Sequence, residues 1–371
     1  MQELVSARLS LYVWGGSITA VPEEPQYVLS KTKLSTEDII TFEISELIKD
    51  YVDIEFNGDY NSIVQTKWAK WIVVRTYSDD STDTFTQHAI AFRGYGNISD
   101  GINPELSKDV MISNTTVSNL CGQFMTLPVY SFDEEGVTGV SYIQGSSELK
   151  SIVTGSAERY TIAQNVHLNP PSTDVLTIDK TFDVASSTDN TINSTLLDES
   201  ADQVVITSSD GTTKTIKIQC IEECKNTPNK VSFINKFGVM QDIWFFAKRK
   251  DSFSSKNESY KKSILNINSS VSYDISSHQN VVLENQGKEK IVMNTGFVDE
   301  SYNEVIKEML VSEYVYISHS SRRSPTDPLF PLAIPVSVVT DSLEIKTRKN
   351  DKLIEYTLEF EADSDFIQSV R

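Results

Sequence analysis

The densest apolar pattern of the chain lies in residues 230–246, which read KVSFINKFGVMQDIWFF. Val231 and Phe233 fall on one face of a strand, because side chains in a strand alternate with a period of two. The pattern breaks at residues 235–238, and a short apolar run follows at 243–246. This order predicts two strands joined by a turn, which we place at the centre of a C-terminal core.

A helix is predicted further along, where Ser301 and Glu304 match a capping box. Its apolar residues form one face: Tyr302, Ile306, Met309 and Leu310. Strand patterns follow at 311–317, and a closing hairpin is predicted from 343–348 and 353–360. These elements complete the predicted C-terminal core.

Between these elements the polar segment 252–263 is expected to be exposed. Residues 264–267 and 271–275 read as strands on either side of a short polar turn. We therefore expect this segment to lie at the surface of the C-terminal region.

Alternation also marks the N-terminal part of the chain. Strands are predicted at 8–14, 27–30, 40–44, 68–77 and 88–92, the last two joined by a polar hairpin loop. Ser45 can cap a short helix whose apolar residues form one stripe. The pattern indicates a β-domain with a helical insert.

In the middle of the chain, Asp210 and Gly211 separate two alternating runs at 204–207 and 213–218. This predicts a hairpin with a two-residue turn, because both turn residues tolerate positive φ.

Length and pattern together predict three domains, since a single core rarely extends beyond about 250 to 300 residues. We expect an N-terminal β-sandwich domain at 1–125, a small antiparallel β-domain at 126–225, and a C-terminal β-domain with one helix at 226–371. The expected fold class is mainly β: multi-domain antiparallel β-sandwiches with two short helical inserts.

Charge narrows the possible partners. The chain has 33 Lys and Arg against 52 Asp and Glu, a net charge of -19. Such a surface repels phosphate backbones and anionic membranes, so nucleic acid is not expected as the principal ligand. The start of the chain lacks the pattern of a signal peptide, and no apolar stretch reaches about 18 residues. We therefore expect synthesis in a cytoplasm and no membrane insertion.

Three cysteines, Cys121, Cys220 and Cys224, are too few for a disulfide framework in a chain of this length. We expect reduced, buried thiols. Cys220 and Cys224 resemble half of a metal site, but two further ligands at short spacing are missing. Partly buried thiols explain the pair better, and no metal or cofactor is expected.

No catalytic motif is found. The four histidines do not pair at metal-ligand spacing, and the sequence has no P-loop, dinucleotide fingerprint or nucleophile elbow. A hydrolase that acts on the cell wall would need an acid/base pair, and none is recognisable. We predict no catalytic residues and no enzymatic activity.

Consecutive aromatic residues suggest an interface instead. Residues 244–246 point to both faces of their strand, so either the strand is covered on both sides or one face packs on another subunit. Trp14, beside two glycines, leaves the same alternatives. With a basic pair in a polar loop, the candidate interface residues are Trp14, Trp244, Phe245, Phe246, Arg322 and Arg323.

Several stretches resemble uncharacterised proteins encoded by tailed bacteriophages and prophages of the Bacteroidetes kind. They are NKFGVMQDIWFF, NTGFVDESYNEVIKEMLVSE and NDKLIEYTLEFE, and the N-terminal LYVWGGSITAVPEEPQYVLSKTKL and FEISELIKDYV are similar to the start of such proteins. The resemblance implies a virion structural protein of the neck or tail, and it supplies no catalytic residues. A similarity of the C-terminal pattern to β-domains of baseplate hub components favours the tail over the capsid.

The resemblance also implies how the protein would work. It would oligomerise into a ring through copies of itself and connect other virion proteins, after synthesis in the host cytoplasm. A negative surface would let DNA pass without specific binding. The alternative is a receptor-binding or adhesin-like β-domain protein that recognises the host surface.

Overall fold

The computed structural model describes residues 3–34, 39–58, 65–101, 110–121, 127–128, 131–132, 135–153, short strands between 159 and 193, 201–267, 271–273, 275–276, 278–318, 333–340 and 353–364. These residues form a mainly β structure with two α-helices, as expected from the sequence. The pair Arg322 and Arg323 and the predicted strand at 343–348 lie outside the described residues.

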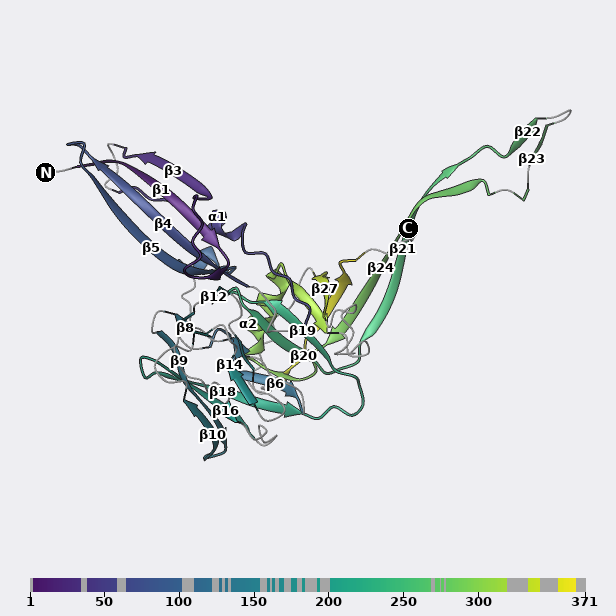
Figure 1. Ribbon diagram of the computed structural model, residues 1–371. Coiled ribbons are helices and arrows are strands. Elements are labelled where there is room, and N and C mark those ends of the chain that lie inside the picture. Colours follow the sequence, from purple (N-terminus) through teal and green to yellow (C-terminus); the bar gives the residue numbers. More distant parts are fainter. Residues whose placement is uncertain are drawn as a thin grey trace.

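The N-terminal sheet has four antiparallel strands in the order β3-β1-β4-β5 (Figure 1). Their bounds are β1 (Leu4–Trp14), β3 (Tyr27–Thr32), β4 (Thr66–Tyr77) and β5 (Thr82–Phe92). One face packs in an apolar cluster with the segment that contains α1 (Ser45–Lys49). Residues 40–44, predicted as a strand, lie in that segment without pairing to the sheet.

The middle sheet has the order β10-β9-β17-β18-β6, with β8 paired to β9. Their bounds are β6 (Thr116–Leu120), β8 (Ser131–Phe132), β9 (Glu135–Gln144), β10 (Ser147–Val153), β17 (Gln203–Ser208) and β18 (Thr213–Ile221). The pairing of β6 with β18 is parallel. Further short strands are β2 (Gly16–Ser17), β7 (Leu127–Pro128), β11 (Arg159–Tyr160), β12 (Ile162–Ala163), β13 (His167–Asn169), β14 (Val175–Ile178), β15 (Phe182–Asp183) and β16 (Ile192–Asn193).

The predicted hairpin at Asp210 is present, but its turn differs from the prediction. Thr207 pairs with Thr213, and only Gly211 has a positive φ, of 81°. The amide of Ser208 donates to the carbonyl of Thr212, so the loop has three residues and ends on a left-handed glycine.

The C-terminal sheet has seven strands in the order β20-β19-β26-β27-β29-β24-β21. Their bounds are β19 (Asn229–Ile234), β20 (Met240–Phe245), β21 (Lys250–Lys261), β24 (Asn280–Asn294), β26 (Val315–Ser318), β27 (Ala333–Val338) and β29 (Thr357–Ala362). Smaller elements are the 3-10 helix η1 (Ile98–Asp100), β22 (Leu265–Ile267), β23 (Val271–Tyr273), β25 (Val298–Asp299) and β28 (Leu353–Ile354). The strand pair predicted at 230–246 and its turn are confirmed.

Helix α2 (Tyr302–Val311) lies against the C-terminal core, as its apolar face predicts. The predicted capping box is wrong. The hydroxyl of Ser301 makes no capping bond, and its amide donates to Oδ1 of Asp299 at 2.9 Å. Glu304 instead pairs with Lys307 on the exposed side of the helix.

Apolar clusters connect the three sheets. Trp14 and Trp68 at the end of the N-terminal sheet pack in one cluster with Tyr142 and Val204 of the middle sheet. Residues 52–56 pack against β19 and β20 of the C-terminal sheet. The three sheets therefore share core residues. The domain boundaries near residues 125 and 225 remain predictions from the sequence.

The prediction of reduced, buried thiols is wrong. Cys121, just after β6, and Cys220 in β18 form a disulfide, with their Cα atoms 5.1 Å apart. Cys224 is a free, exposed cysteine. The parallel pairing of β6 and β18 brings the two partners together across 99 residues of sequence. Among the described residues, no group of three or more His, Cys, Asp or Glu side chains could hold a metal ion.

Candidate functional site

The aromatic candidates for an interface lie largely inside the chain. Trp14 and Phe246 are buried, and Phe245 is fully buried in the C-terminal core. Trp244 is half-buried, its Nε1 donates to Oδ1 of Asn119 at 2.9 Å, and its ring stacks on Phe246. This placement agrees with the alternative of a strand covered on both sides by its own chain, so these side chains offer little surface to a partner.

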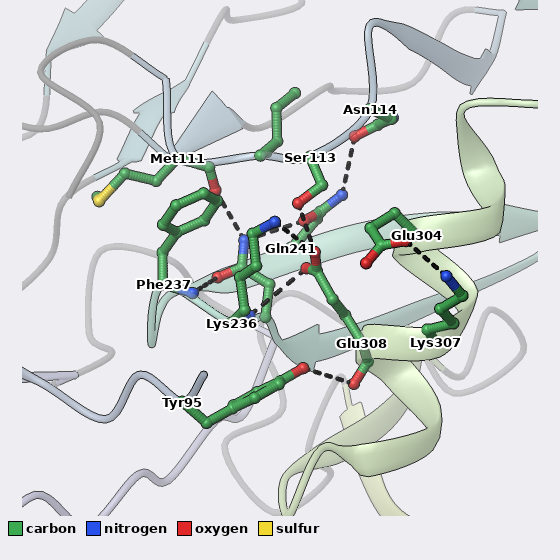
Figure 2. A network of polar contacts seen from close by, with 12 residues as sticks. Tyr95, Met111, Ser113, Asn114, Lys236, Phe237, Gln241, Glu304, Lys307 and Glu308 are labelled. Carbon is green, nitrogen blue, oxygen red and sulfur yellow. Dashed lines mark hydrogen bonds and ion pairs between the residues drawn. The ribbon is translucent and has the colours of Figure 1, made fainter. Parts of the chain in front are cut away.

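A buried carboxylate joins the sheets to each other. Glu308 of α2 is 3% exposed and accepts hydrogen bonds from the hydroxyl of Ser113 and the amide of Lys236 (Figure 2). The Lys236 ammonium lies 3.6 Å from the same carboxylate. The backbone carbonyl of Glu308 accepts from the hydroxyl of Tyr95 at 2.9 Å. One helical residue thus holds segments from three distant parts of the chain.

Burial sets the electrostatics of this junction. It raises the pKa of Glu308, although the Ser113 hydroxyl and the Lys236 ammonium act in the opposite direction. Burial and the nearby Glu308 carboxylate also raise the pKa of Tyr95. A raised carboxyl pKa can mark a catalytic acid. Here the carboxylate is engaged by three neighbouring groups and is almost closed to solvent, so its geometry is that of a structural junction.

Amide side chains extend the junction toward the middle sheet. Nδ2 of Asn235 donates to the carbonyl of Met111 at 2.7 Å and to Oε1 of Gln241 at 2.9 Å. Nε2 of Gln241 donates in turn to Oδ1 of Asn114 at 3.1 Å. Because each buried amide has partners, the network stabilises one arrangement of the two sheets.

A small cavity of about 90 Å³ lies next to the junction. Arg93 and Glu313, two of its lining residues, are ion-paired to each other, and the guanidinium of Arg93 also donates to the carbonyl of Val52 at 2.8 Å. Sites for small molecules usually measure about 300 to 1,000 Å³. The cavity is too small for such a site, and its charged groups already serve the packing.

The most unusual feature is a ribbon formed by β21 and β24, which we call the arm, residues 250–294 (Figure 1). β24 pairs with β29 only over residues 290–294, so beyond that point the ribbon has two strands. Every residue of β21 is exposed. Figure 1 shows the arm extending away from the body, with β22 and β23 at its far end.

Large apolar side chains are exposed along this arm. Ile275 is 97% exposed and Leu283 is 72% exposed, the latter at the irregularity in the pairing of β21 with β24. We call the full set the arm patch: Phe253, Tyr260, Leu265, Tyr273, Ile275, Val282 and Leu283. Burying one such side chain contributes about 1.5 to 3 kcal/mol. The patch is therefore the strongest candidate for a contact surface among the described residues.

The exposure of residues 252–263 was predicted from their polar sequence, but the arm itself was not. Its strands alternate weakly because neither face covers a core. The pairing of residues 250–261 with 280–292 also joins segments that the sequence pattern treats separately.

No protein-family model matches the chain, and comparison with curated proteins and with solved structures finds no match. Within the described residues, no helix has the length and apolar character needed to cross a membrane.

Proposed function

We propose that the chain is a structural protein of a bacteriophage virion, a tail or neck component that oligomerises into a ring and connects neighbouring virion proteins. The observation that supports this proposal best is the arm. A two-stranded ribbon is at best marginally stable in water, and this one exposes apolar residues along its length. A partner that covers the arm would stabilise both the ribbon and the assembly.

The rest of the fold suits a rigid building block. The buried network around Glu308 and Gln241 and the shared clusters fix the sheets relative to each other. A projecting arm on such a body can reach a neighbour without distorting it. Assembly proteins of this kind act by packing, and their interfaces bury large areas with few special residues.

Charge is compatible with this role. The arm contains six Lys and five Asp or Glu, whereas the rest of the chain has 27 Lys or Arg and 47 Asp or Glu, a net charge of -20. A strongly negative body would not trap DNA that passes through a ring. In the proposed assembly, other virion proteins and sister copies are the partners.

The test has two parts. Phage particles purified from the strain that encodes the chain should contain it at many copies per particle, as measured by quantitative peptide mass spectrometry. The full chain should also form oligomers in light scattering at about 10 to 100 µM, a range in which micromolar contacts populate. A chain absent from particles and monomeric at every concentration would contradict the proposal.

The arm also favours a second candidate, a receptor-binding or adhesin-like protein of the virion. Exposed Tyr273 and Ile275 near the tip could contact a host surface. Binding of the purified chain to host cells, lost when residues 263–278 are replaced by a short Gly/Ser turn, would support this role. Oligomers that form without binding to cells would support the structural role instead.

A further inference from the structure

We propose that the basic side of the N-terminal sheet of one copy docks on the acidic segment around α1 of a second copy of this chain. This inference rests on the proposed function, because it assigns a contact that would build the oligomer. It commits to a sister chain as the partner and to one surface on each copy.

The strand register places basic residues of the N-terminal sheet on one side. Tyr12 pairs with Lys70, and Lys70 pairs with His88. Arg8 lies four residues from Tyr12 on β1, so it points to the same side. The apolar residues of β1 that pack under the α1 segment alternate with this set and point to the opposite side. We call Arg8, Tyr12, Lys70 and His88 the basic face.

No carboxylate in the four strands neutralises the basic face. Asp83 is the sole Asp or Glu of β1, β3, β4 and β5, and it pairs with Arg75 at 2.8 Å on the covered side. Among the described residues, neither Arg8 nor Lys70 forms an ion pair, and the Lys70 ammonium lies 5.9 Å from the centroid of the Tyr12 ring. The face therefore keeps a positive charge on a chain whose net charge is -19.

The segment that covers the other side of the same sheet is acidic. Residues 43–55, which we call the acidic segment, contain one lysine and five Asp or Glu, a net charge of -4, and all five acids are exposed. The lysine, Lys49, already pairs with Glu313 at 3.3 Å. Glu46 and Asp50 are four residues apart at α1, so they lie on one side of it. Apolar residues of the helix pack on the sheet instead.

Apolar side chains accompany the charges on both surfaces. Val28 is 45% exposed, and Ile72 and Val74 are half-buried, all three on the side of the basic face. Tyr51 in the acidic segment is 37% exposed, and Ile39 just before it is 67% exposed. Apolar contacts inside a polar rim are the usual anatomy of an interface. Opposite charges at the rim select the partner and its orientation more than they add affinity.

A sister chain fits the basic face better than nucleic acid does. Arg8 and Lys70 are the permanent cations of the face, and two cations release few counterions from a phosphate backbone. The strongly negative field of the whole chain also repels such a backbone. A second copy supplies a complementary surface instead, at the same concentration as the face itself.

The positions of the two surfaces determine the type of assembly. They lie on opposite sides of one layer, so each copy can use both at once. Figure 1 shows this layer projecting from the body, with α1 on one side of it. A contact between two different surfaces is heterologous, so it repeats from copy to copy and gives a ring or an open filament. A ring is the form that the proposed function requires.

Charge reversal in the full chain tests the inference. One variant carries Arg8→Glu and Lys70→Glu, which make the basic face acidic. A second carries Glu46→Lys and Asp50→Lys, which make the acidic segment basic. Each variant alone should raise the dissociation constant of the oligomer at least about tenfold in sedimentation equilibrium, because like charges then meet. An equimolar mixture should associate again to within about fivefold of wild type, because the two reversed surfaces fit each other.

Controls separate this contact from a general effect of charge. Lys217→Glu with Lys225→Glu makes the same change of charge at exposed positions elsewhere, and it should change the dissociation constant less than about twofold. Arg8→Glu alone, at an exposed position that should tolerate it, should weaken the oligomer in the same direction as the double variant.

Several outcomes would contradict the inference. Oligomers weakened equally by the control and by the basic-face variant, or a mixture that does not recover, would overturn it and leave the proposed function standing. Duplex DNA that binds the wild type and not the Arg8→Glu variant would also overturn it, because the face would then bind phosphate. A wild-type chain that is always monomeric would overturn both the inference and the proposed function.

Discussion

The hydroxyl of Tyr95 donates a 2.9 Å hydrogen bond to the backbone carbonyl of Glu308, a residue 213 positions further along the chain. Tyr95 follows the last strand of the N-terminal sheet, and its own amide donates to the carbonyl of Lys236 at 2.9 Å. Glu308 lies in α2 and accepts from Ser113 with its side chain. The bond therefore fixes the exit of one sheet against the core of another.

Removing this single bond should lower stability without changing the fold. Tyr95→Phe deletes the donor and keeps the ring, so the free energy of unfolding should fall by about 1 kcal/mol, the usual net contribution of such a bond. Urea denaturation followed by tryptophan fluorescence measures the change. Tyr273→Phe, at an exposed position of the arm, is the control and should leave the midpoint unchanged. Equal midpoints for wild type and Tyr95→Phe would show that the bond contributes nothing.

The buried carboxylate predicts a pH dependence. Burial raises the pKa of Glu308, so the native state binds its proton more tightly than the unfolded chain does. The contribution of this group to the free energy of unfolding is therefore greatest below the unfolded pKa. This contribution falls as the pH rises from the unfolded pKa to the raised native pKa. Above the native pKa the contribution no longer changes with pH.

Glu308→Gln should remove this fall, because glutamine does not titrate and keeps an oxygen that can accept from Ser113. The difference in unfolding free energy between wild type and variant should change as pH rises above the unfolded pKa of a glutamate and through the raised native pKa, in the direction of a less stable wild type at high pH. Glu258→Gln, on the exposed strand β21, is the control, because the charge of the nearer Glu304 itself raises the pKa of Glu308. Parallel stability curves for wild type and Glu308→Gln would contradict the predicted coupling.

Much of the local structure could be predicted from the sequence. The strand pair around residues 235–238 was predicted because a dense apolar pattern and a glycine coincide there, and Gly238 does adopt a positive φ of 81°. Alternation of apolar and polar residues alone was a less reliable predictor of strands. Ile40, Phe42 and Ile44 alternate as a strand does, yet Phe42 and Ile44 pack on the N-terminal sheet from an irregular segment. Burial on one side produces the same pattern with or without strand pairing.

Features that depend on distant partners could not be predicted. The capping box failed for a local reason, because Asp299, two residues before Ser301, already accepts a hydrogen bond from its amide. The run Trp244–Phe246 left open whether its own chain or another subunit covers the strand, and the structure shows Phe245 and Phe246 buried and Trp244 half-buried within the chain. Long-range pairing also determines the arm and the disulfide, and neither has a local signal in the sequence.

The cysteines give a direct chemical test of the arrangement of β6 and β18. In the native, unreduced protein, iodoacetamide should label only Cys224, because it is exposed while Cys121 and Cys220 are joined. Peptide mapping under non-reducing conditions should recover the Cys121–Cys220 linkage, and reduction in denaturant should expose all three thiols. If all three cysteines are labelled before reduction, the disulfide is absent and the thiols are reduced, as the sequence alone predicts.

Gly211 and Gly238 have the same backbone φ but different surroundings. Comparing alanine variants of the two therefore distinguishes the free-energy cost of a left-handed residue from the cost of a steric clash. Gly211 and Gly238 both have a φ of 81° and both end a three-residue hairpin loop. A Cβ at Gly211 would meet nothing within 4 Å, whereas a Cβ at Gly238 would lie 2.6 Å from the backbone nitrogen of Gly94. Gly211→Ala should therefore cost about 1 to 2 kcal/mol, the penalty of a left-handed conformation for a residue with a side chain.

Gly238→Ala should cost considerably more, because the backbone of residues 93–94 would have to move away from the turn that it contacts. That movement would also disturb the bond from the Tyr95 amide to the carbonyl of Lys236. We expect Gly238→Ala to lower the urea midpoint at least about twice as far as Gly211→Ala does, or to prevent folding. Equal midpoints for the two variants would mean that the close approach of the N-terminal sheet to this turn contributes little to the junction.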